Sequence, residues 1–151
     1  MKFDVLFLRR DERGFTLIEV MVVVVILGIL AGWIAPKLMG RTDEAKQLKA
    51  RIQIESLATA LKLYKLDNGF YPDTEQGLQV LVEKPGTGQV PASWRHGGYL
   101  EKQKVPADPW GKPYLYLSPG VHGDFDMVSH GADGVPGGEG KDRDINSWEI
   151  D

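Results

Sequence analysis

The sequence predicts an α+β fold organised around one long N-terminal helix. Three observations predict it: an apolar run over residues 15–35, an amphipathic helical pattern that follows it, and short strand-like segments after residue 110. One long helix, one short helix and a small antiparallel sheet together make an α+β module.

The run from Phe15 to Ala35 has the length and composition of a membrane-spanning helix. Its twenty-one residues carry one charge, Glu19. At about 1.5 Å per residue this helix covers roughly 30 Å, the hydrocarbon thickness of a bilayer. The run is too long for an ordinary secretory signal, and no small-x-small cleavage site follows it. Glu19 has two interpretations: an anion stabilised near the helix start, or a buried carboxylate that needs a partner charge.

The helix is expected to continue to about Leu66 and to end at Asp67-Asn68-Gly69. Pro36 removes one backbone hydrogen bond and predicts a kink or a weak turn. Apolar residues at helical spacing predict the side of the second half that faces the core. These residues are Leu48, Ile52, Leu57, Leu61 and Tyr64.

After the long helix the sequence predicts a short helix, a loop and two strands. Asp73 and Gln76 form a box-like cap for a two-turn helix. Residues 84–98 are punctuated by glycine and proline and predict a loop. Residues 114–117 and 125–129 predict two short strands, and the connection between them is long enough for an antiparallel hairpin.

Composition excludes several classes of protein. The chain has 151 residues and a net charge of −3, which fits one small domain plus a membrane segment. It has no basic stripe of the kind that binds nucleic acid. No His-x-x-x-His, Gly-x-Ser-x-Gly or phosphate-binding glycine motif occurs, so a membrane-anchored hydrolase is disfavoured and no enzyme is predicted. The chain has no cysteine, so an exported domain of this size needs another staple or oligomerisation.

The C-terminal tail is acidic and rich in glycine. Residues 124–151 hold eight acids and two bases, and residues 133–145 have carboxylates at both ends of a flexible loop. Calcium takes about six to eight oxygens from carboxylates and carbonyls on such a loop. The EF-hand pattern is absent, and one copy of a calcium-binding nonapeptide cannot stack. From the residues alone, a solvated acidic loop with Asx-turns is slightly favoured over a metal site.

The junction Gly14-Phe15-Thr16-Leu17-Ile18-Glu19, followed by the apolar run, resembles the type III signal of type IV pilins and pseudopilins. The resemblance implies that a prepilin peptidase cuts between Gly14 and Phe15, that Phe15 is then N-methylated, and that Glu19 acts in assembly. A methylated amine is still a cation, so Glu19 of one subunit can pair with the Phe15 amine of its neighbour in a fibre core.

The same resemblance implies three parts: a leader over residues 1–14, a transmembrane and assembly helix over residues 15–35, and a globular periplasmic domain over residues 36–151. It places the chain in the bacterial inner membrane as a single-pass protein, with its N-terminus in the cytoplasm. Two readings of residues 28–36 stay open. Their glycines and proline are ordinary for a membrane helix, or they let the helix unwind as subunits pack.

Further segments resemble the major pseudopilin of type II secretion systems: Tyr64–Asn68, Tyr71-Pro72, Glu75–Leu78, Asp108–Gly111 and Gly131–Gly134. The resemblance implies a pilin-like fold and a structural role as a homopolymer, the periplasmic pseudopilus, which drives protein export. Implied partners are minor pseudopilins, the prepilin peptidase and an inner-membrane secretion platform. The alternatives are a type IV pilin for adhesion or motility, which is expected to have a C-terminal cysteine pair, and a minor pseudopilin.

In major pseudopilins a calcium ion holds the C-terminal loop in place of a disulfide. Carried over by resemblance, the carboxylates of Asp133 and Asp144 and the carbonyls of His130 and Val135 are the expected calcium ligands. Asp142 is the expected third carboxylate, and the resemblance does not decide which of Asp142 and Asp144 binds directly.

Overall fold

The computed structural model describes residues 14–150, and the side chains of residues 35–40 are not among those described. The predicted leader therefore lies, except for Gly14, outside the described residues. The chain forms two compact units, one ending at Met39 and one beginning at Gly40. The elements are α1 (Leu17–Asn68), η1 (Gly77–Leu81), β1 (Leu115–Leu117), β2 (Asp126–Ser129), η2 (Gly140–Asp142), β3 (Ile145–Asn146) and η3 (Ser147–Glu149), where η marks a 3-10 helix.

The helix α1 confirms the predicted long helix and its end. At its start, the side-chain oxygen of Thr16 accepts a hydrogen bond from the amide of Glu19 at 3.3 Å, as an N-cap does. At its end, Gly69 adopts a left-handed conformation with φ of 87°, and its amide donates to the carbonyl of Lys65 at 2.7 Å. The helix is continuous through Pro36, and the kink predicted there stays a prediction.

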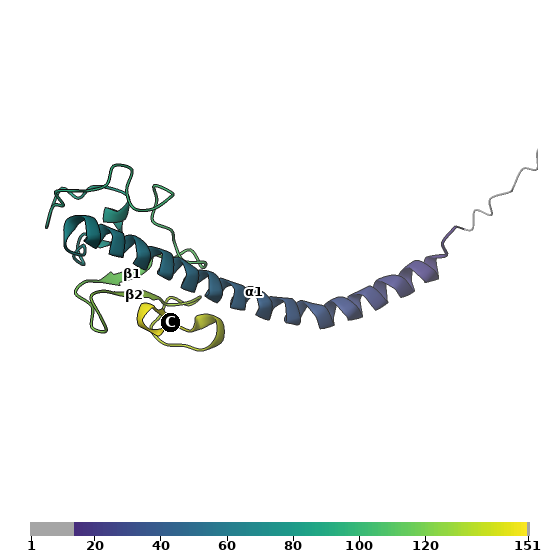
Figure 1. Ribbon diagram of the computed structural model, residues 1–151. Coiled ribbons are helices and arrows are strands. Elements are labelled where there is room, and N and C mark those ends of the chain that lie inside the picture. The colour runs from purple at the N-terminus through teal and green to yellow at the C-terminus, as the bar shows by residue number, and fades with distance from the viewer. Residues whose placement is uncertain (1–13, 151) are drawn as a thin grey trace, which may run out of the picture. The chain divides into compact units, whose positions relative to one another are not determined.

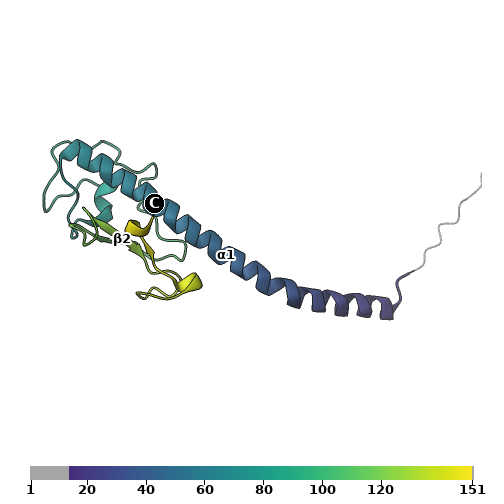
Figure 2. The same ribbon diagram turned by 60° about the horizontal axis from the view of Figure 1, so that its bottom comes forward.

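The hydrophobic core lies in the second unit, where the C-terminal half of α1 packs on the sheet and on η1. Figures 1 and 2 show β1 and β2 beside this half of α1. Residues from the helix alternate by three and four positions, so that one face of α1 is buried. The core consists of Ala50, Ile54, Leu57, Ala60, Leu61, Tyr64, Leu78, Val80, Leu81, Tyr99, Tyr114, Met127 and Ile145.

The predicted core face of α1 was wrong at its N-terminal end. Leu57, Leu61 and Tyr64 are buried, but Leu48 is 60% exposed and Ile52 is 55% exposed. Each residue turns a helix by about 100°, so Leu48 points about 180° away from Leu57. Ala50 and Ile54, which the sequence prediction did not include, occupy the buried face instead.

The predicted two-turn helix after Tyr71 is a five-residue 3-10 helix, η1. The predicted cap is present: the amide of Gln76 donates to Asp73 Oδ1 at 2.7 Å, and the amide of Asp73 donates to Gln76 Oε1 at 3.3 Å. Gly77 has φ of 60°. An α-helix cannot continue through a left-handed residue, so the capped turn and η1 remain separate.

The sheet has three antiparallel strands in the order β1-β2-β3. The predicted hairpin is confirmed: β1 and β2 pair with Leu115 opposite Val128 and Leu117 opposite Asp126. The third strand, β3, was not predicted. It pairs with the end of β2, with Ser129 opposite Ile145, and so brings the acidic tail onto the sheet.

Candidate functional sites at the helix start and in the C-terminal loop

The first site is the start of α1, where the predicted cleavage and assembly residues lie. Gly14 and Phe15 precede the helix as irregular chain, and Phe15 is 80% exposed. Glu19 lies in the first turn, where the helix dipole stabilises an anion. Among the residues that the structure describes, Glu19 forms no ion pair.

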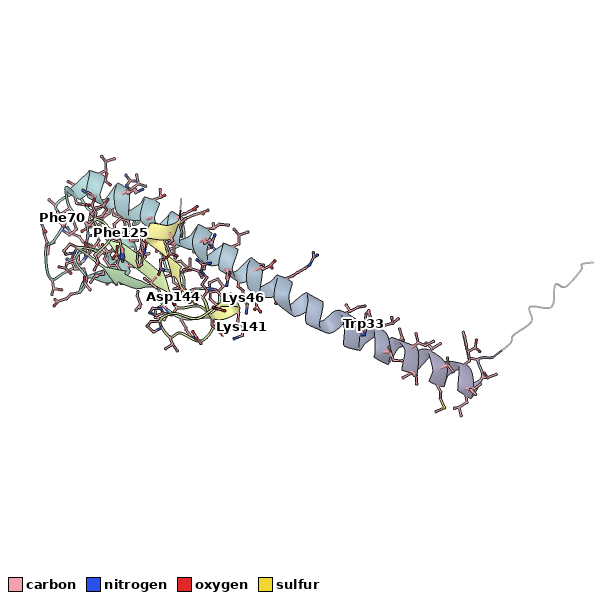
Figure 3. All side chains as sticks on the ribbon, turned by 90° about the horizontal axis from the view of Figure 1, so that it is seen from below. Trp33, Lys46, Phe70, Phe125, Lys141 and Asp144 are labelled. Carbon is pink, nitrogen blue, oxygen red and sulfur yellow. The ribbon has the colours of Figure 1, made fainter. Side chains whose placement is uncertain are left out.

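The first half of α1 is apolar on every side. Residues Leu17–Ile34 have a mean hydropathy of 2.7, and the segment is long enough to cross a membrane. None of this window is buried within the chain's own fold. Trp33, labelled on the first half of α1 in Figure 3, is 85% exposed. Such a surface is stable only in apolar surroundings, which lipid or other apolar helices supply.

The second site is the loop over residues 130–144, called here the acidic loop. The register of β2 and β3 places His130 opposite Asp144, and His130 Nδ1 lies 3.0 Å from Asp144 Oδ1. Across the loop, the side-chain amide of Gln47 on α1 donates to the carbonyl of Gly140. Figure 3 shows Asp144 on this loop beside α1. The loop is therefore anchored to the sheet at its ends and to the helix at its far side.

Two of the predicted ligand carboxylates accept hydrogen bonds from the loop itself. Asp144 Oδ2 accepts from the amide of Gly137 at 2.8 Å. Asp133 Oδ1 accepts from the amide of Val135 at 3.1 Å, which is the Asx-turn expected of such a loop. The carbonyl of His130, a predicted ligand, accepts from the amide of Gly134 at 3.0 Å.

The third predicted carboxylate, Asp142, pairs with the next lysine. Lys141 Nζ lies 2.7 Å from Asp142 Oδ1 and 2.8 Å from Oδ2. The hydrogen bond to Asp142 raises the pKa of Lys141, and the negative charges of Asp43 and Asp133 add to this effect. Both side chains of the pair are partly exposed, so the pair adds little to stability.

The donor types of the acidic loop fit calcium, although the carboxylates are engaged elsewhere in this conformation. Carboxylate and carbonyl oxygens are the ligands that calcium prefers. In the described part of the chain, no three acidic, histidine or cysteine side chains lie together as a metal cluster. Asp133 accepts its hydrogen bond through Oδ1, and a carboxylate has lone pairs beyond the one that an amide hydrogen bond uses.

Glycines let the two halves of the acidic loop touch through their backbones. The amide of Ala132 donates to the carbonyl of Lys141 at 3.0 Å. A Cβ on Gly131 would lie 2.8 Å from the carbonyl oxygen of Asp142, and one on Gly138 would lie 2.6 Å from it. Both glycines also have positive φ. Only glycine fits at these positions, so the loop is a compact ring.

A lysine that the sequence analysis did not single out also contacts the loop. Asp108 is buried, and its Oδ1 accepts from the amides of Trp110 at 3.0 Å and Lys112 at 2.7 Å. Lys112 Nζ donates to the carbonyl of Ala132 at 2.9 Å. Twenty residues separate the two partners, so no local pattern in the sequence could have predicted this contact.

A second feature that the sequence analysis missed is a histidine–tryptophan stack. The rings of His122 and Trp148 are parallel within 10°, with centroids 3.8 Å apart. His122 Nδ1 lies 3.0 Å from Oδ2 of the buried Asp126. Burial by itself raises the pKa of Asp126, but hydrogen bonds from the His122 ring and from the amides of Val121 and His122 outweigh it. The pKa of Asp126 therefore lies below its usual value.

Two family models match the chain. The model described as "Type II secretion system (T2SS), protein G" matches residues 37–148. The model described as "Prokaryotic N-terminal methylation motif" matches residues 9–35. The first model covers the unit with the core and the acidic loop, and the second covers the start of α1.

Several known proteins are similar to the chain. Type II secretion system core protein G of Pseudomonas aeruginosa is 54% identical over 141 residues, which is 93% of this chain and 98% of the relative. The protein of the same name from Vibrio cholerae is 53% identical over 141 residues, covering 93% and 94%. The crystal structure of the major pseudopilin from the type 2 secretion system of enterohaemorrhagic Escherichia coli superimposes with a TM-score of 0.64 at 43% identity. The match covers 75% of this chain and 95% of the crystallised pseudopilin chain.

Proposed function

Because the chain belongs to the type II secretion system protein G family and is a structural subunit of a pseudopilus, we propose that it is made as a precursor, processed in the inner membrane and polymerised in the periplasm. The polymer drives protein export through the type II secretion system. The role is structural and includes no catalytic step. The relatives' names support a major pseudopilin over the type IV pilin and minor pseudopilin alternatives.

Processing occurs at the irregular segment before α1. A prepilin peptidase cuts after Gly14, and the new N-terminus, Phe15, is methylated. Support comes from the methylation motif over residues 9–35 and from the exposure of Phe15 outside the helix. The chain crosses the inner membrane once, through Leu17–Ile34, and its C-terminal unit lies in the periplasm.

Assembly buries the apolar half of α1 against the same half of neighbouring subunits. The observation that carries this proposal is that the window Leu17–Ile34 has no buried part in the chain's own fold, while a complete core lies beyond Gly40. In the low-dielectric fibre core, Glu19 needs a cation, and the methylated amine of a neighbouring Phe15 is one. This pair sets the axial register. Minor pseudopilins and the inner-membrane platform are the further partners.

The test is to express the full chain in cells that contain a type II secretion system and lack their own major pseudopilin. The proposal expects the membrane fraction to contain residues 15–151 with one added methyl group by mass spectrometry. It also expects recovery of secretion, measured as the enzyme activity of a secreted substrate in the medium. A Gly14→Val variant is the matched control, and it should stay uncleaved in the membrane without restoring secretion. Methylated, cleaved chain that leaves secretion at the background level would overturn the proposed role.

We also propose that the acidic loop binds calcium through the carboxylates of Asp133 and Asp144 and the carbonyls of His130 and Val135, with Asp142 as the third carboxylate. The proposal is supported by five residues on one glycine-rich ring that offer oxygen ligands of the kind calcium prefers. A bound calcium ion would neutralise negative charge of the loop and join the two sides of the ring. The domain has no disulfide, so this metal supplies the staple that a small exported domain requires.

A further inference from the structure

Lys112 supplies a positive charge to the acidic loop from outside the loop. Its Nζ donates to the carbonyl of Ala132 at 2.9 Å, and the side chain is half-buried. Within the described part of the chain, no carboxylate forms an ion pair with Lys112. The ammonium is thus bound by a loop carbonyl, which is the kind of oxygen that also binds a calcium ion.

The backbone of Lys112 is held by a buried network. Asp108 is 5% exposed, and its Oδ1 accepts from the amide of Lys112 at 2.7 Å. Asp108 Oδ2 accepts from the hydroxyl of Ser129 at 2.7 Å, and Ser129 lies at the end of β2, directly before the loop. The backbone of Lys112 is therefore held to the same strand from which the loop starts. From this backbone position the lysine side chain reaches the carbonyl of Ala132 in the loop.

The end of this side chain lies against the loop. Gly134 has φ of 75°, and a Cβ at this position would collide with the side-chain end of Lys112. The amide of Gly134 closes the turn by donating to the carbonyl of His130 at 3.0 Å. The ammonium of Lys112 therefore lies against the turn over residues 130–134 and donates to the carbonyl of Ala132 within that turn.

We propose that Lys112 is a built-in cation of the acidic loop, which holds the turn over residues 130–134 when no metal is bound and lowers the loop's affinity for calcium by like-charge repulsion. The second effect rests on the proposed calcium site, whereas the first does not. A charge-assisted hydrogen bond to a carbonyl is stronger than a neutral one, so its loss loosens the turn. A cation close to a calcium site opposes binding of a second cation.

The Lys112 contact adds one fixed point to a loop that has few apolar residues to order it. The affinity is set by two opposed contributions of one residue: the lysine pre-organises the turn, and its charge repels the ion. The repulsion between Lys112 and calcium is expected to exceed the gain from pre-organising the turn. The reason is that the pairing of β2 with β3 and the glycine contacts already order much of the loop.

The test uses the full chain in a non-ionic detergent and compares Lys112→Met with Lys104→Met. Methionine keeps most of the apolar stem and removes the charge. Lys104 is exposed on another loop, so its substitution is a control for the same change in net charge. With chelator present, K112M is expected to unfold about 5 °C below K104M. Equal midpoints would overturn the proposed bracing of the turn.

The second readout is calcium affinity by isothermal titration calorimetry. K112M is expected to bind calcium about three- to tenfold more tightly than the wild type, and K104M about as tightly as the wild type. Unchanged calcium affinity in K112M would overturn the proposed effect of Lys112 on calcium affinity, while leaving the calcium site itself in place. If the wild type binds no calcium, both the calcium site and the effect of Lys112 on calcium affinity are overturned. The unfolding comparison in chelator then still tests whether Lys112 stabilises the turn.

A variant that keeps the positive charge, Lys112→Arg, makes the result interpretable if K112M does not fold. If K112M is unfolded in chelator but folds with calcium, the bracing role is supported, because the metal replaces the missing cation. If K112M is unfolded in both conditions, Lys112→Arg decides. A folded K112R shows that a cation is needed at this position. An unfolded K112R overturns the proposal, because packing of the lysine stem is then what the fold requires.

Discussion

His130 and Asp144 are joined by a contact of 3.0 Å between Nδ1 and Oδ1, at the point where β2 and β3 separate. This pair closes the acidic loop into a ring whose two ends come from strands of the same sheet. Asp144 is thus both a structural closure and a proposed calcium ligand. Its substitution would disturb the ring even without metal. Asp133 lies inside the ring, and among the described residues its one hydrogen bond comes from the nearby amide of Val135, so it is the better position to test.

Calcium is expected to raise the thermal unfolding midpoint of the wild type, because an ion that binds only the folded state stabilises it by mass action. At about a hundred times the dissociation constant this amounts to about 2.7 kcal/mol, or about 10 °C for a domain of this size. Asp133→Ala should lose most of this rise. Glu139→Ala removes an exposed carboxylate from the same loop and is the matched control. Equal calcium responses from the two variants would contradict the assignment of Asp133 as a ligand.

Glu19→Ala is expected to leave membrane insertion intact and to block polymerisation. Removal of one carboxylate makes the helix more apolar, so insertion is not impaired. The neighbour's methylated amine then lacks its partner in the fibre core, and leaving a buried charge unpaired costs about 3–5 kcal/mol per contact. Membrane fractionation measures insertion, and electron microscopy of sheared fibres measures assembly.

Two further variants separate the charge of Glu19 from its shape. Glu19→Gln keeps the size and should fail to assemble as the alanine variant does. Glu19→Asp keeps the charge and should assemble in part. Fibres of normal length and number from the glutamine variant would show that the negative charge has no role in assembly.

Leu61→Ala is expected to destabilise the C-terminal unit by about 2–5 kcal/mol, because it leaves a cavity under a fully buried side chain. Leu48→Ala is the matched control on the same helix. Leu48 is 60% exposed, and its truncation should change the free energy of unfolding by about 0.5 kcal/mol or less. Urea unfolding of both variants measures the difference. Comparable losses would mean that the outward face of α1 is packed in solution.

Local patterns predicted most of the fold. The long apolar helix, its glycine stop, the capping pair Asp73 and Gln76, and the β1–β2 hairpin all depend on residues close in sequence. The core face of α1 was predicted correctly at Leu57, Leu61 and Tyr64 but wrongly at Leu48 and Ile52. The step of five residues from Ile52 to Leu57 turns the helix by about 140°, so the first two residues lie outside the face that Ala50 and Ile54 bury.

The candidate site was less accessible to sequence reasoning. The strand β3 has two residues, too few for any alternating pattern to reveal it, yet it sets the contact between His130 and Asp144. The contact of Lys112 with Ala132 likewise joins residues twenty positions apart. Such contacts are fixed by tertiary packing, and the types of residue in the loop indicate only which chemistry it can perform.

The domain is expected to lose stability in alkali through its buried tyrosines. Burial raises the pKa of Tyr64 and of Tyr116 to about 12, above the usual value of about 10 for tyrosine, because the folded state disfavours the charged phenolate. This contribution to stability is fully present below pH 10 and is lost as the pH rises from 10 towards 12. Unfolding midpoints followed between about pH 8 and pH 11.5 should therefore decline above pH 10. Tyr116→Phe should flatten this decline, since it removes one of the titrating groups. An unchanged slope in that variant would show that Tyr116 does not ionise on unfolding.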